Sequence, residues 1–441
     1  MEIDNWKFPV KLTQQLAQLN RSMYLALVAV LAAAIFLVWL LSRSTLAVSV
    51  MPENAYVTIN NRPLQQNTSG DIKTTLSPGT YTLKVEADGY VASIREITLH
   101  RARTLKIDAS LDKAPEPYTI SSENNPAKNV QFLSSADDFN TIFYLADNGS
   151  TLYKAKFNIN TEDNVETVYN RPISNPPLSG IQNIIWSPKK DASIFKKGTS
   201  AFFFDFQKYN FISQEEKKYS DNIGDVAWSP DDSKIAYYYS PPSGEKSLVF
   251  ADKTNTEVTR VANLADMNIN NPYLSWSPDS EWLIVIPRNA SYETNKIYLF
   301  NAYTRSFAEI SDTGNNLEAK FSADGSKIIY STYSKDPASP LRAVLSVMDS
   351  DGSNKKSLDL RADLRKVTWL NNSNSEIIVA TWDGNKGAEK IFGYNVDTKQ
   401  ESGFNYTLPA KTYVNDLSLS ANNNLLFYVA NQQFYIIKLK N

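Results

Sequence analysis

The 441-residue chain offers few of the side chains on which catalysis and metal binding most often depend. It contains no cysteine and a single histidine, His100, which excludes thiolate chemistry, iron–sulfur clusters and multi-histidine metal centres. A Ser-His-Asp triad would have to use His100, which stands near no nucleophile motif. No glycine-rich phosphate loop is present. The sequence therefore predicts a protein that is not an enzyme and that carries no cofactor and no metal.

Acidic residues gather in turn sequences. The pairs Asp137-Asp138 and Asp231-Asp232 stand where aspartate side chains commonly accept hydrogen bonds from the nearby backbone. The run Asp349–Asn354 begins like a calcium loop, but it lacks the glycine at the sixth position and an acidic residue at the twelfth, which is Leu360. We interpret the pairs as structural and the run as a hairpin turn.

Five arginine and aromatic residues are better candidates, for binding rather than catalysis. They stand in long loops, and Arg, Tyr and Trp are over-represented at binding hot spots. These candidate ligand-face residues are Arg288, Tyr292, Tyr333, Arg342 and Trp382. In the repeats described next, the loops 240–246, 287–296, 333–342 and 382–390 join second to third strands and emerge on one face. The alternative, that they are ordinary variable loops, stays open.

The elements that must position these loops are repeats of one unit. Its clearest copy reads VAWSPDDSKIAYYYS from Val226, and related copies have an aromatic or apolar anchor 42 to 54 residues apart. The anchors are Phe132, Trp186, Trp228, Trp276, Phe321, Trp369 and Leu419. This spacing is typical of four-stranded propeller blades, and the period-two alternation of apolar residues argues against helical repeats. We expect the anchor to lie between neighbouring blades.

The Trp-Ser-Pro-Asp-Asp unit resembles the repeats of WD-repeat-like propellers of the TolB type, which read Trp-Ser-Pro-Asp-Gly at this place. The sequence thus predicts an all-β chain in which residues 118–441 form a seven-bladed β-propeller. The seventh repeat has strands near 416–420, 425–430 and 434–439 and then ends. We predict that the orphan strand Tyr118–Ser121 supplies its fourth strand and closes the ring, because an open edge would otherwise remain.

A smaller β domain precedes the propeller, separated from it by a linker at 112–117. Strands are predicted at 46–50, 56–59, 79–87, 94–99 and 104–111, in a small antiparallel sandwich. Residues 46–111 resemble the PEGA domain of envelope proteins, and the name-giving tetrapeptide appears as Pro52-Glu53-Asn54-Ala55. Asn replaces Gly there and tolerates a left-handed backbone. The resemblance implies a PEGA-like stalk, a spacer or interaction module without catalysis.

An apolar run near the N-terminus predicts a membrane anchor. Residues 23–42 contain no charged side chain and suffice to cross a bilayer as one helix. A cleaved signal peptide is the alternative, but the run is long and ends without a small-x-small site. Lys7, Lys11 and Arg21 precede it and Arg43 follows, so the cytoplasmic side is assigned to residues 1–22 and the extracytoplasmic side to the rest.

Together these features predict a single-pass protein of the bacterial cell envelope that binds or scaffolds, with the propeller as recognition head. The lipid bilayer is one partner, through residues 23–42, and another envelope protein, a peptide or a glycan is the second. A net charge of −2 gives no reason to expect nucleic acid. An envelope sensor that relays ligand capture through the helix, and a propeller-type hydrolase or lyase, are the alternatives.

Overall fold

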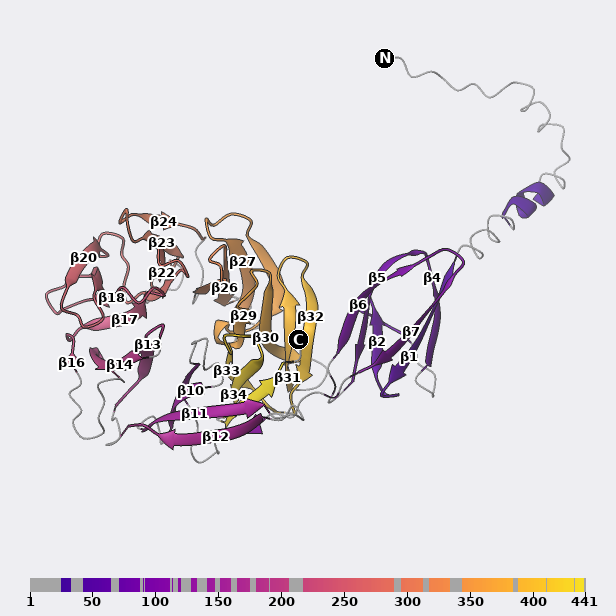
Figure 1. Cartoon of the computed structure of the whole chain (residues 1–441). Coiled ribbons are helices and arrows are strands. Elements are labelled where there is room, and N and C mark those ends of the chain that lie inside the picture. Colours follow the sequence, from indigo (N-terminus) through magenta and orange to yellow (C-terminus); the bar gives the residue numbers. More distant parts are fainter. Residues whose placement is uncertain are drawn as a thin grey trace, which may run out of the picture. The chain divides into compact units, whose positions relative to one another are not determined.

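The computed structural model divides the chain into two compact units, Met1–Asp112 and Lys113–Asn441 (Figure 1). The residues that the structure describes are 25–32, 43–64, 71–87, 90, 92–111, 113, 118–119, 128–132, 141–146, 151–159, 165–174, 180–189, 191–205, 217–288, 295–311, 317–333, 343–383, 388–409, 411–431 and 433–439.

Only part of the predicted membrane segment 23–42 is described. Residues 25–32 are helical and their side chains are exposed. Within the described ranges, no helix has the length and apolar character that crossing a membrane requires. The rest of the segment and the predicted cytoplasmic residues 1–22 lie outside the described residues.

The first unit is a sandwich of two small sheets. Its strands are β1 (Ser44–Met51), β2 (Tyr56–Ile59), β3 (Arg62–Pro63), β4 (Asp71–Leu76), β5 (Gly79–Glu86), β6 (Ser93–Leu99) and β7 (Thr104–Ser110). One sheet has the order β4-β1-β7 and the other β3-β2-β5-β6. Alternate residues of β1, namely Leu46, Val48 and Val50, are buried in the shared core. Each such burial stabilises the fold by about 1.5–3 kcal/mol.

The structure corrects the sequence prediction for this unit in three respects. Strands β3 and β4 were not predicted, because their short and polar sequences lack a continuous apolar alternation. The sandwich is not wholly antiparallel, since β1 pairs with β7 in parallel. Asn54 is not among the residues of positive φ, so its tolerance of a left-handed backbone is not used. Asn60 and Asn61 do have positive φ, as a tight hairpin turn requires.

The second unit consists, in its described part, of seven four-stranded antiparallel sheets in chain order, a β-propeller (Figure 1). The first four sheets contain β9 (Lys128–Phe132), β10 (Thr141–Ala146), β11 (Thr151–Ile159) and β12 (Val165–Pro172); β13 (Asn183–Trp186), β14 (Ala192–Lys197), β15 (Ser200–Asp205) and β16 (Lys217–Lys218); β17 (Ile223–Trp228), β18 (Ile235–Tyr239), β19 (Ser247–Ala251) and β20 (Val258–Asn263); and β21 (Tyr273–Trp276), β22 (Trp282–Ile286), β23 (Tyr298–Asn301) and β24 (Phe307–Glu309).

The remaining sheets follow the same order of strands. They contain β25 (Glu318–Phe321), β26 (Lys327–Tyr333), β27 (Ala343–Asp349) and β28 (Lys356–Arg361); a 3-10 turn, η3 (Leu364–Lys366), then β29 (Val367–Trp369), β30 (Glu376–Asp383), β31 (Ala388–Asn395) and β32 (Gln400–Thr407); and β33 (Val414–Leu419), β34 (Leu425–Ala430) and β35 (Gln433–Lys438) with β8 (Tyr118–Thr119).

The second strands β10 and β34 are almost wholly apolar because neighbouring sheets cover both of their faces. All six residues of β10 are buried, and β34 shows nearly the same pattern. A continuous apolar run is the signature of a strand buried on two sides. The anchors Trp228 and Trp276 lie between sheets, as predicted. Trp228 packs against Phe203 of the preceding sheet, and Trp276 donates its indole N–H to the carbonyl of Ala227, at 3.2 Å.

The predicted closing strand is present. Thr119 pairs with Tyr435 and Tyr118 with Ile436, in antiparallel register, so β8 becomes the fourth strand of the last sheet. A segment that precedes the first repeat therefore hydrogen-bonds the last one. Residues 120 and 121, which the prediction included, lie outside the described residues.

Candidate binding site at the inner strands

The first strand of each sheet lies on the inside of the propeller. Contacts join β9 to β13, β13 to β17, β17 to β21, β21 to β25 and β29 to β33, while η3 contacts β25 and β33. These first strands begin at the face of the propeller at which the second strands end. We call this face the starting face. Ile223 at the start of β17, for example, pairs with Tyr239 at the end of β18. Side chains at the beginning of the inner strands are therefore brought together.

The residue three positions before the repeat anchor is polar in every repeat. These residues are Asn129, Asn183, Asp225, Tyr273, Glu318, Lys366 and Asp416. The recurrence of a polar residue at this position makes the beginning of the inner strands a candidate for ligand contact.

Two of these residues stand at irregularities of the strand ladder. The pairing register shifts between Ile223 and Val226 in β17, around Asp225, and between Val414 and Asp416 in β33. A bulge inserts an extra residue and turns a side chain away from the direction that regular pleating would give it. The bulges are therefore the local reason why two acidic side chains are placed at the inner ring.

We name five residues at this level the axial charge cluster: Asp225, Glu318, Lys320, Arg365 and Asp416. They come from β17, β25, η3 and β33. Lys320 interacts electrostatically with Asp416 and Glu318, and Arg365 interacts with both Lys320 and Asp416. Acidic and basic groups from the inner strands and η3 are thus brought together.

Asp225 connects two neighbouring sheets. One carboxylate oxygen, Oδ2, accepts a hydrogen bond from the backbone N–H of Leu274 in β21, at 2.9 Å. Burial raises the pKa of Asp225, while this N–H and the charges of Arg288 and Lys196 work in the opposite direction.

Lys196 of β14 is the basic neighbour of Asp225. Its side chain is buried, and its ammonium donates a hydrogen bond to the carbonyl of Ile223. Burial lowers the pKa of Lys196 to about 8, against the opposing effect of Asp225. The ammonium group therefore titrates close to neutral pH.

Lys320 ties β25 to the start of the next sheet. Its ammonium donates to the carbonyls of Leu364, at 2.9 Å, and Val367, at 3.3 Å. Burial lowers the pKa of Lys320, and Asp416 and Glu318 oppose that shift. The hydrogen bonds fix the ammonium group in place, so its charge is preorganised rather than mobile.

Asp416 combines exposure to solvent with a raised pKa. Its side chain is exposed, yet the surrounding protein desolvates the carboxyl group enough to raise the pKa, with Lys320 and Arg365 opposing. Its Oδ1 accepts the backbone N–H of Leu417 at 2.9 Å.

Three of the five candidate ligand-face residues are described, and all three lie at the starting face. The guanidinium of Arg288 lies 5.5 Å from the ring centre of Tyr273 and interacts with Asp225. The hydroxyl of Tyr333 donates to Asp363 Oδ1 at 2.7 Å, and burial together with this carboxylate raises its pKa to about 12.

Trp382 is the third. Its ring stacks on Tyr413 with 5.9 Å between centroids and 2° between planes. Arg288 and Tyr333 adjoin the axial charge cluster, because Tyr333 also interacts with Glu318 and Arg365. Tyr292 and Arg342 lie outside the described residues.

The axial charge cluster was not predicted from the sequence. The prediction of binding residues used loop length and loop composition, whereas the charged groups lie within the inner strands and in η3. The signal that would have found them is the polar residue three positions before each anchor. It becomes visible when the repeats are aligned on their anchors and not on their turns.

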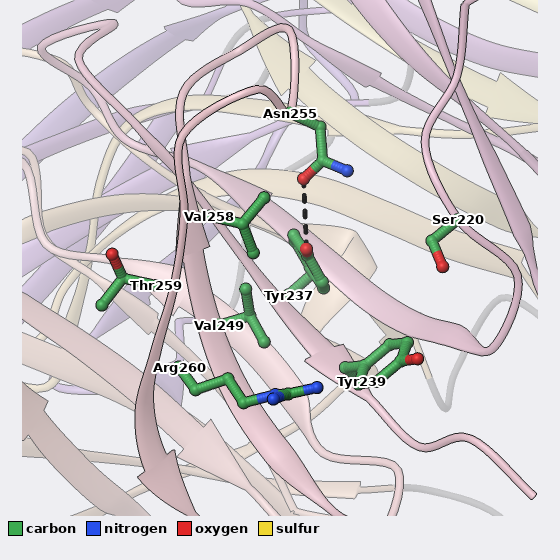
Figure 2. Close-up of a pocket in the computed structure, with 8 residues that line it drawn as sticks. All are labelled: Ser220, Tyr237, Tyr239, Val249, Asn255, Val258, Thr259 and Arg260. Carbon is green, nitrogen blue, oxygen red and sulfur yellow. Dashed lines mark hydrogen bonds between the residues drawn. The ribbon is translucent and has the colours of Figure 1, made fainter.

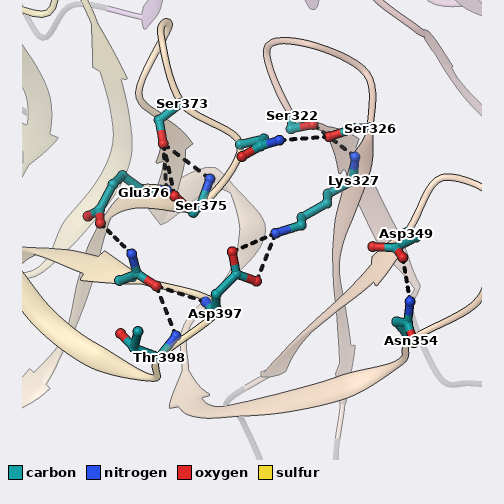
Figure 3. A network of polar contacts seen from close by, with 12 residues as sticks. Ser322, Ser326, Lys327, Asp349, Asn354, Ser373, Ser375, Glu376, Asp397 and Thr398 are labelled. Carbon is teal, nitrogen blue, oxygen red and sulfur yellow. Dashed lines mark hydrogen bonds and ion pairs between the residues drawn. The ribbon is translucent and has the colours of Figure 1, made fainter.

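The opposite face carries hydrogen-bonded turns that hold sheets together. Lys327 Nζ bonds both carboxylate oxygens of Asp397, at 2.8 and 2.7 Å, across the sheets that begin with β25 and β29 (Figure 3). Asn374 likewise donates to Ser326 and Asp324 of the neighbouring sheet, at 3.1 and 2.9 Å. These groups bond one another, which is typical of structural cross-links.

The acidic turns have the structural role that the sequence suggested. Asp231 Oδ1 accepts hydrogen bonds from the hydroxyls of Ser229 and Ser233, at 2.6 and 2.8 Å. In the hairpin after β27, Asp349 accepts from the amide of Asn354 at 2.6 Å. Among the described residues, no group of three His, Asp or Glu side chains could hold a metal ion. Asp137 and Asp138 lie outside the described part of the chain.

A separate hollow of about 610 Å³ lies on the flank of the third sheet (Figure 2). Its lining residues are Ser220, Tyr237, Tyr239, Val249, Asn255, Val258, Thr259 and Arg260. It involves none of the residues of the axial charge cluster.

Comparison with known proteins identifies the first unit. Residues 43–115 match the PEGA domain family. The chain contains a PEGA domain. The match includes the tetrapeptide at 52–55 and confirms the prediction for this part of the sequence. No curated protein matches the chain.

The PEGA-containing chain resembles solved structures along its second unit. An oligogalacturonate lyase in complex with manganese matches with a TM-score of 0.53 and 11% identity, over 74% of this chain and 96% of the lyase. A TolB protein from Agrobacterium tumefaciens matches with a TM-score of 0.40 and 13% identity, over 66% and 99%. TolB from Acinetobacter baumannii gives 0.37 and 15%, over 66% and 77%. At these identities the likeness concerns the fold alone.

Proposed function

We propose that this protein is a non-enzymatic binding or scaffold protein of the bacterial cell envelope, with the PEGA domain as stalk and the propeller as recognition head. The observation that carries the proposal is the axial charge cluster. Within it, Lys320 is desolvated and its ammonium is fixed by hydrogen bonds to the carbonyls of Leu364 and Val367. Preorganised charges favour a ligand with complementary charges.

The ligand is a charged peptide segment of another envelope protein. A peptide presents ionised side chains of both signs together with backbone donors and acceptors. The cluster contains acidic and basic groups, Arg288 and Tyr333 adjoin it, and Trp382 lies at the same face. Arginine and aromatic side chains of this kind commonly form binding hot spots.

The head is a closed ring of seven blades. The seven four-stranded sheets found in the described residues support this number, as does the pairing of β8 with β35. Closure removes the free strand edge that the last sheet would otherwise present, and it holds the inner strands in the positions on which the axial charge cluster depends.

Charge reversal at the starting face tests the binding role. The full chain carrying Arg365→Glu is compared with wild type in chemical cross-linking and affinity capture from its own cells. Arg365 is exposed, so the change leaves the core intact. Loss of the partners recovered with wild type is expected. The matched control is Lys355→Glu, which reverses an exposed charge in a turn of the opposite face. Equal recovery with Arg365→Glu would contradict the proposal.

The membrane anchor is proposed at residues 23–42, with residues 1–22 in the cytoplasm and the remainder outside. The apolar run and the lysines and arginine that precede it support this orientation. Protease added to intact, outer-membrane-permeabilised cells should digest or release the propeller. Survival of the propeller until the inner membrane is opened would reverse the orientation.

A further inference from the structure

The hollow on the flank of the third sheet has a composition unlike that of the axial charge cluster. Cross-strand pairing places Tyr237 of β18, Val249 of β19 and Arg260 of β20 in one row on one face of the sheet. Tyr239 follows Tyr237 by two residues and shares its face, and Val258 shares that of Arg260. Regular pleating therefore builds a surface that is aromatic and aliphatic at its base and polar at its rim.

Arg260 lies at the rim, where Glu245 balances its charge but does not use all of its N–H donors. Its Nε donates to Glu245 Oε1 at 2.7 Å, and its guanidinium lies 5.8 Å from the ring centre of Tyr239. Both contacts orient the group. In the part of the chain that the structure describes, its Nη atoms form no hydrogen bond and remain as donors. Because Glu245 balances the charge, the hollow does not favour a phosphate or another strong anion.

The amide of Asn255 is oriented in a similar way. The hydroxyl of Tyr237 donates to Asn255 Oδ1 at 3.1 Å (Figure 2). This bond directs the amide so that its NH₂ group is left as a donor, and the structure shows no acceptor for it among the described residues. Ser220 adds a hydroxyl on the other side of the hollow. The rim therefore offers several neutral donors and acceptors in fixed positions.

From this geometry we propose that the hollow binds a glycan through a 2-acetamido sugar, an N-acetylhexosamine. A pyranose ring has apolar C–H faces and hydroxyls that both donate and accept, which matches a base of Tyr and Val under a neutral polar rim. The acetamido group fits the part of the hollow beside Val258 and Arg260 in particular. Its methyl group lies against the exposed Val258, and its carbonyl oxygen accepts from the Arg260 Nη atoms or the Asn255 amide.

The size of the hollow agrees with this occupant. A volume of about 610 Å³ lies within the usual range of small-molecule sites, roughly 300–1,000 Å³, and accommodates two sugar units. Val258 is half exposed and Arg260 is exposed, so a ligand reaches both without movement of the core. The site is distinct from the axial charge cluster, and it does not depend on the function proposed above.

Binding of N,N′-diacetylchitobiose to the full chain in detergent, measured by saturation-transfer NMR and calorimetry, tests the inference. Cellobiose, which has the same size and linkage but lacks the acetamido groups, is the ligand control. Diacetylchitobiose is expected to bind about tenfold or more tightly than cellobiose. No binding of diacetylchitobiose, or equal binding of the two, would overturn the proposal.

Two variants assign the binding to this hollow. Arg260→Ala removes the Nη donors, and Val258→Asp places a carboxylate where the acetamido methyl would lie. Each is expected to weaken diacetylchitobiose binding about tenfold. Both positions are exposed, so unfolding temperatures should stay close to wild type. The matched control Lys355→Ala, an exposed residue elsewhere on the propeller, should bind as wild type does. Unchanged affinity in both variants would refute the assignment.

Discussion

The residue before Asp225 stands where no side chain fits. Gly224 sits in the bulge of β17, and a Cβ atom at this position would lie 2.6 Å from Tyr238 Cδ1 and 3.1 Å from Asn271 Oδ1. The bulge and the packing of Tyr238 therefore require glycine at 224. Lys196 lies beside the same bulge. Its ammonium is buried and donates a hydrogen bond to the carbonyl of Ile223.

The substitution Gly224→Ala should destabilise the protein by about 1–3 kcal/mol, the usual cost of overpacking a well-filled site. Urea unfolding of the full chain measures the change. In the background Tyr238→Leu, which removes the nearest ring atom, the cost of Gly224→Ala should fall. A cost that is the same in both backgrounds would show that the contact with Tyr238 is not its cause.

The lowered pKa of Lys196 predicts that the free energy of unfolding depends on pH. Its pKa is about 8 in the folded protein and about 10.5 in the unfolded chain, so the unfolded state binds more protons between these values. The contribution of Lys196 to the free energy of unfolding therefore rises as pH increases from about 8 to about 10.5, and it is lost as pH falls through about 8. Between about pH 7 and pH 9.5, wild type should gain about 1–2 kcal/mol relative to Lys196→Met.

Urea unfolding at both pH values measures that difference. The comparison with Lys196→Met removes the contributions of the other titrating groups, which the two proteins share. An equal dependence of stability on pH in wild type and variant would show that the Lys196 ammonium is not desolvated.

At the scale of elements, the sequence predicted most of the propeller and less of the PEGA domain. The anchors Trp228 and Trp276 and the Ser-Pro-Asp turns mark the inner strands because packing between sheets and tight turns restrict residue choice. β34 was predicted to the residue. The two-residue strand β3 was missed, since so short an element leaves no periodicity to detect. The charge cluster was missed because single polar residues inside strands carry no pattern until the repeats are aligned.

The pairing of β8 with β35 is testable because the natural chain has no cysteine. Thr119 and Tyr435 are direct cross-strand partners, and such pairs have Cα atoms about 4.5–5.5 Å apart, within the range of disulfides. The double variant Thr119→Cys with Tyr435→Cys should form a disulfide on mild oxidation and gain about 2–4 kcal/mol of stability.

Mass spectrometry for the disulfide and thermal unfolding for its effect provide the measurement. The matched control couples Thr119→Cys with Tyr413→Cys, an exposed position that β8 does not pair with. The control pair should remain reduced. Similar oxidation of both pairs, or a free thiol at both 119 and 435, would contradict the closed ring.

At the scale of the whole molecule, the two faces of the propeller differ in chemistry. The starting face presents the axial charge cluster together with Arg288, Tyr333 and Trp382. The opposite face presents turns whose polar groups bond one another, as in Lys327 with Asp397 (Figure 3). Groups that are satisfied within the protein gain little from a ligand, whereas Arg365 and Asp416 of the cluster are exposed and offer their charges to one. We therefore propose that the protein recognises its ligand at the starting face.

The most direct measurement places a photo-crosslinking benzoylphenylalanine on each face of the full chain in its own cells. Tyr333 stands at the starting face, and Tyr303 is an exposed tyrosine in the turn between β23 and β24, on the opposite face. Both replacements exchange one aromatic ring for another. We predict a discrete cross-linked partner from position 333 and none from position 303. The same adduct from 303, or no adduct from 333 while 303 gives one, would contradict recognition at the starting face.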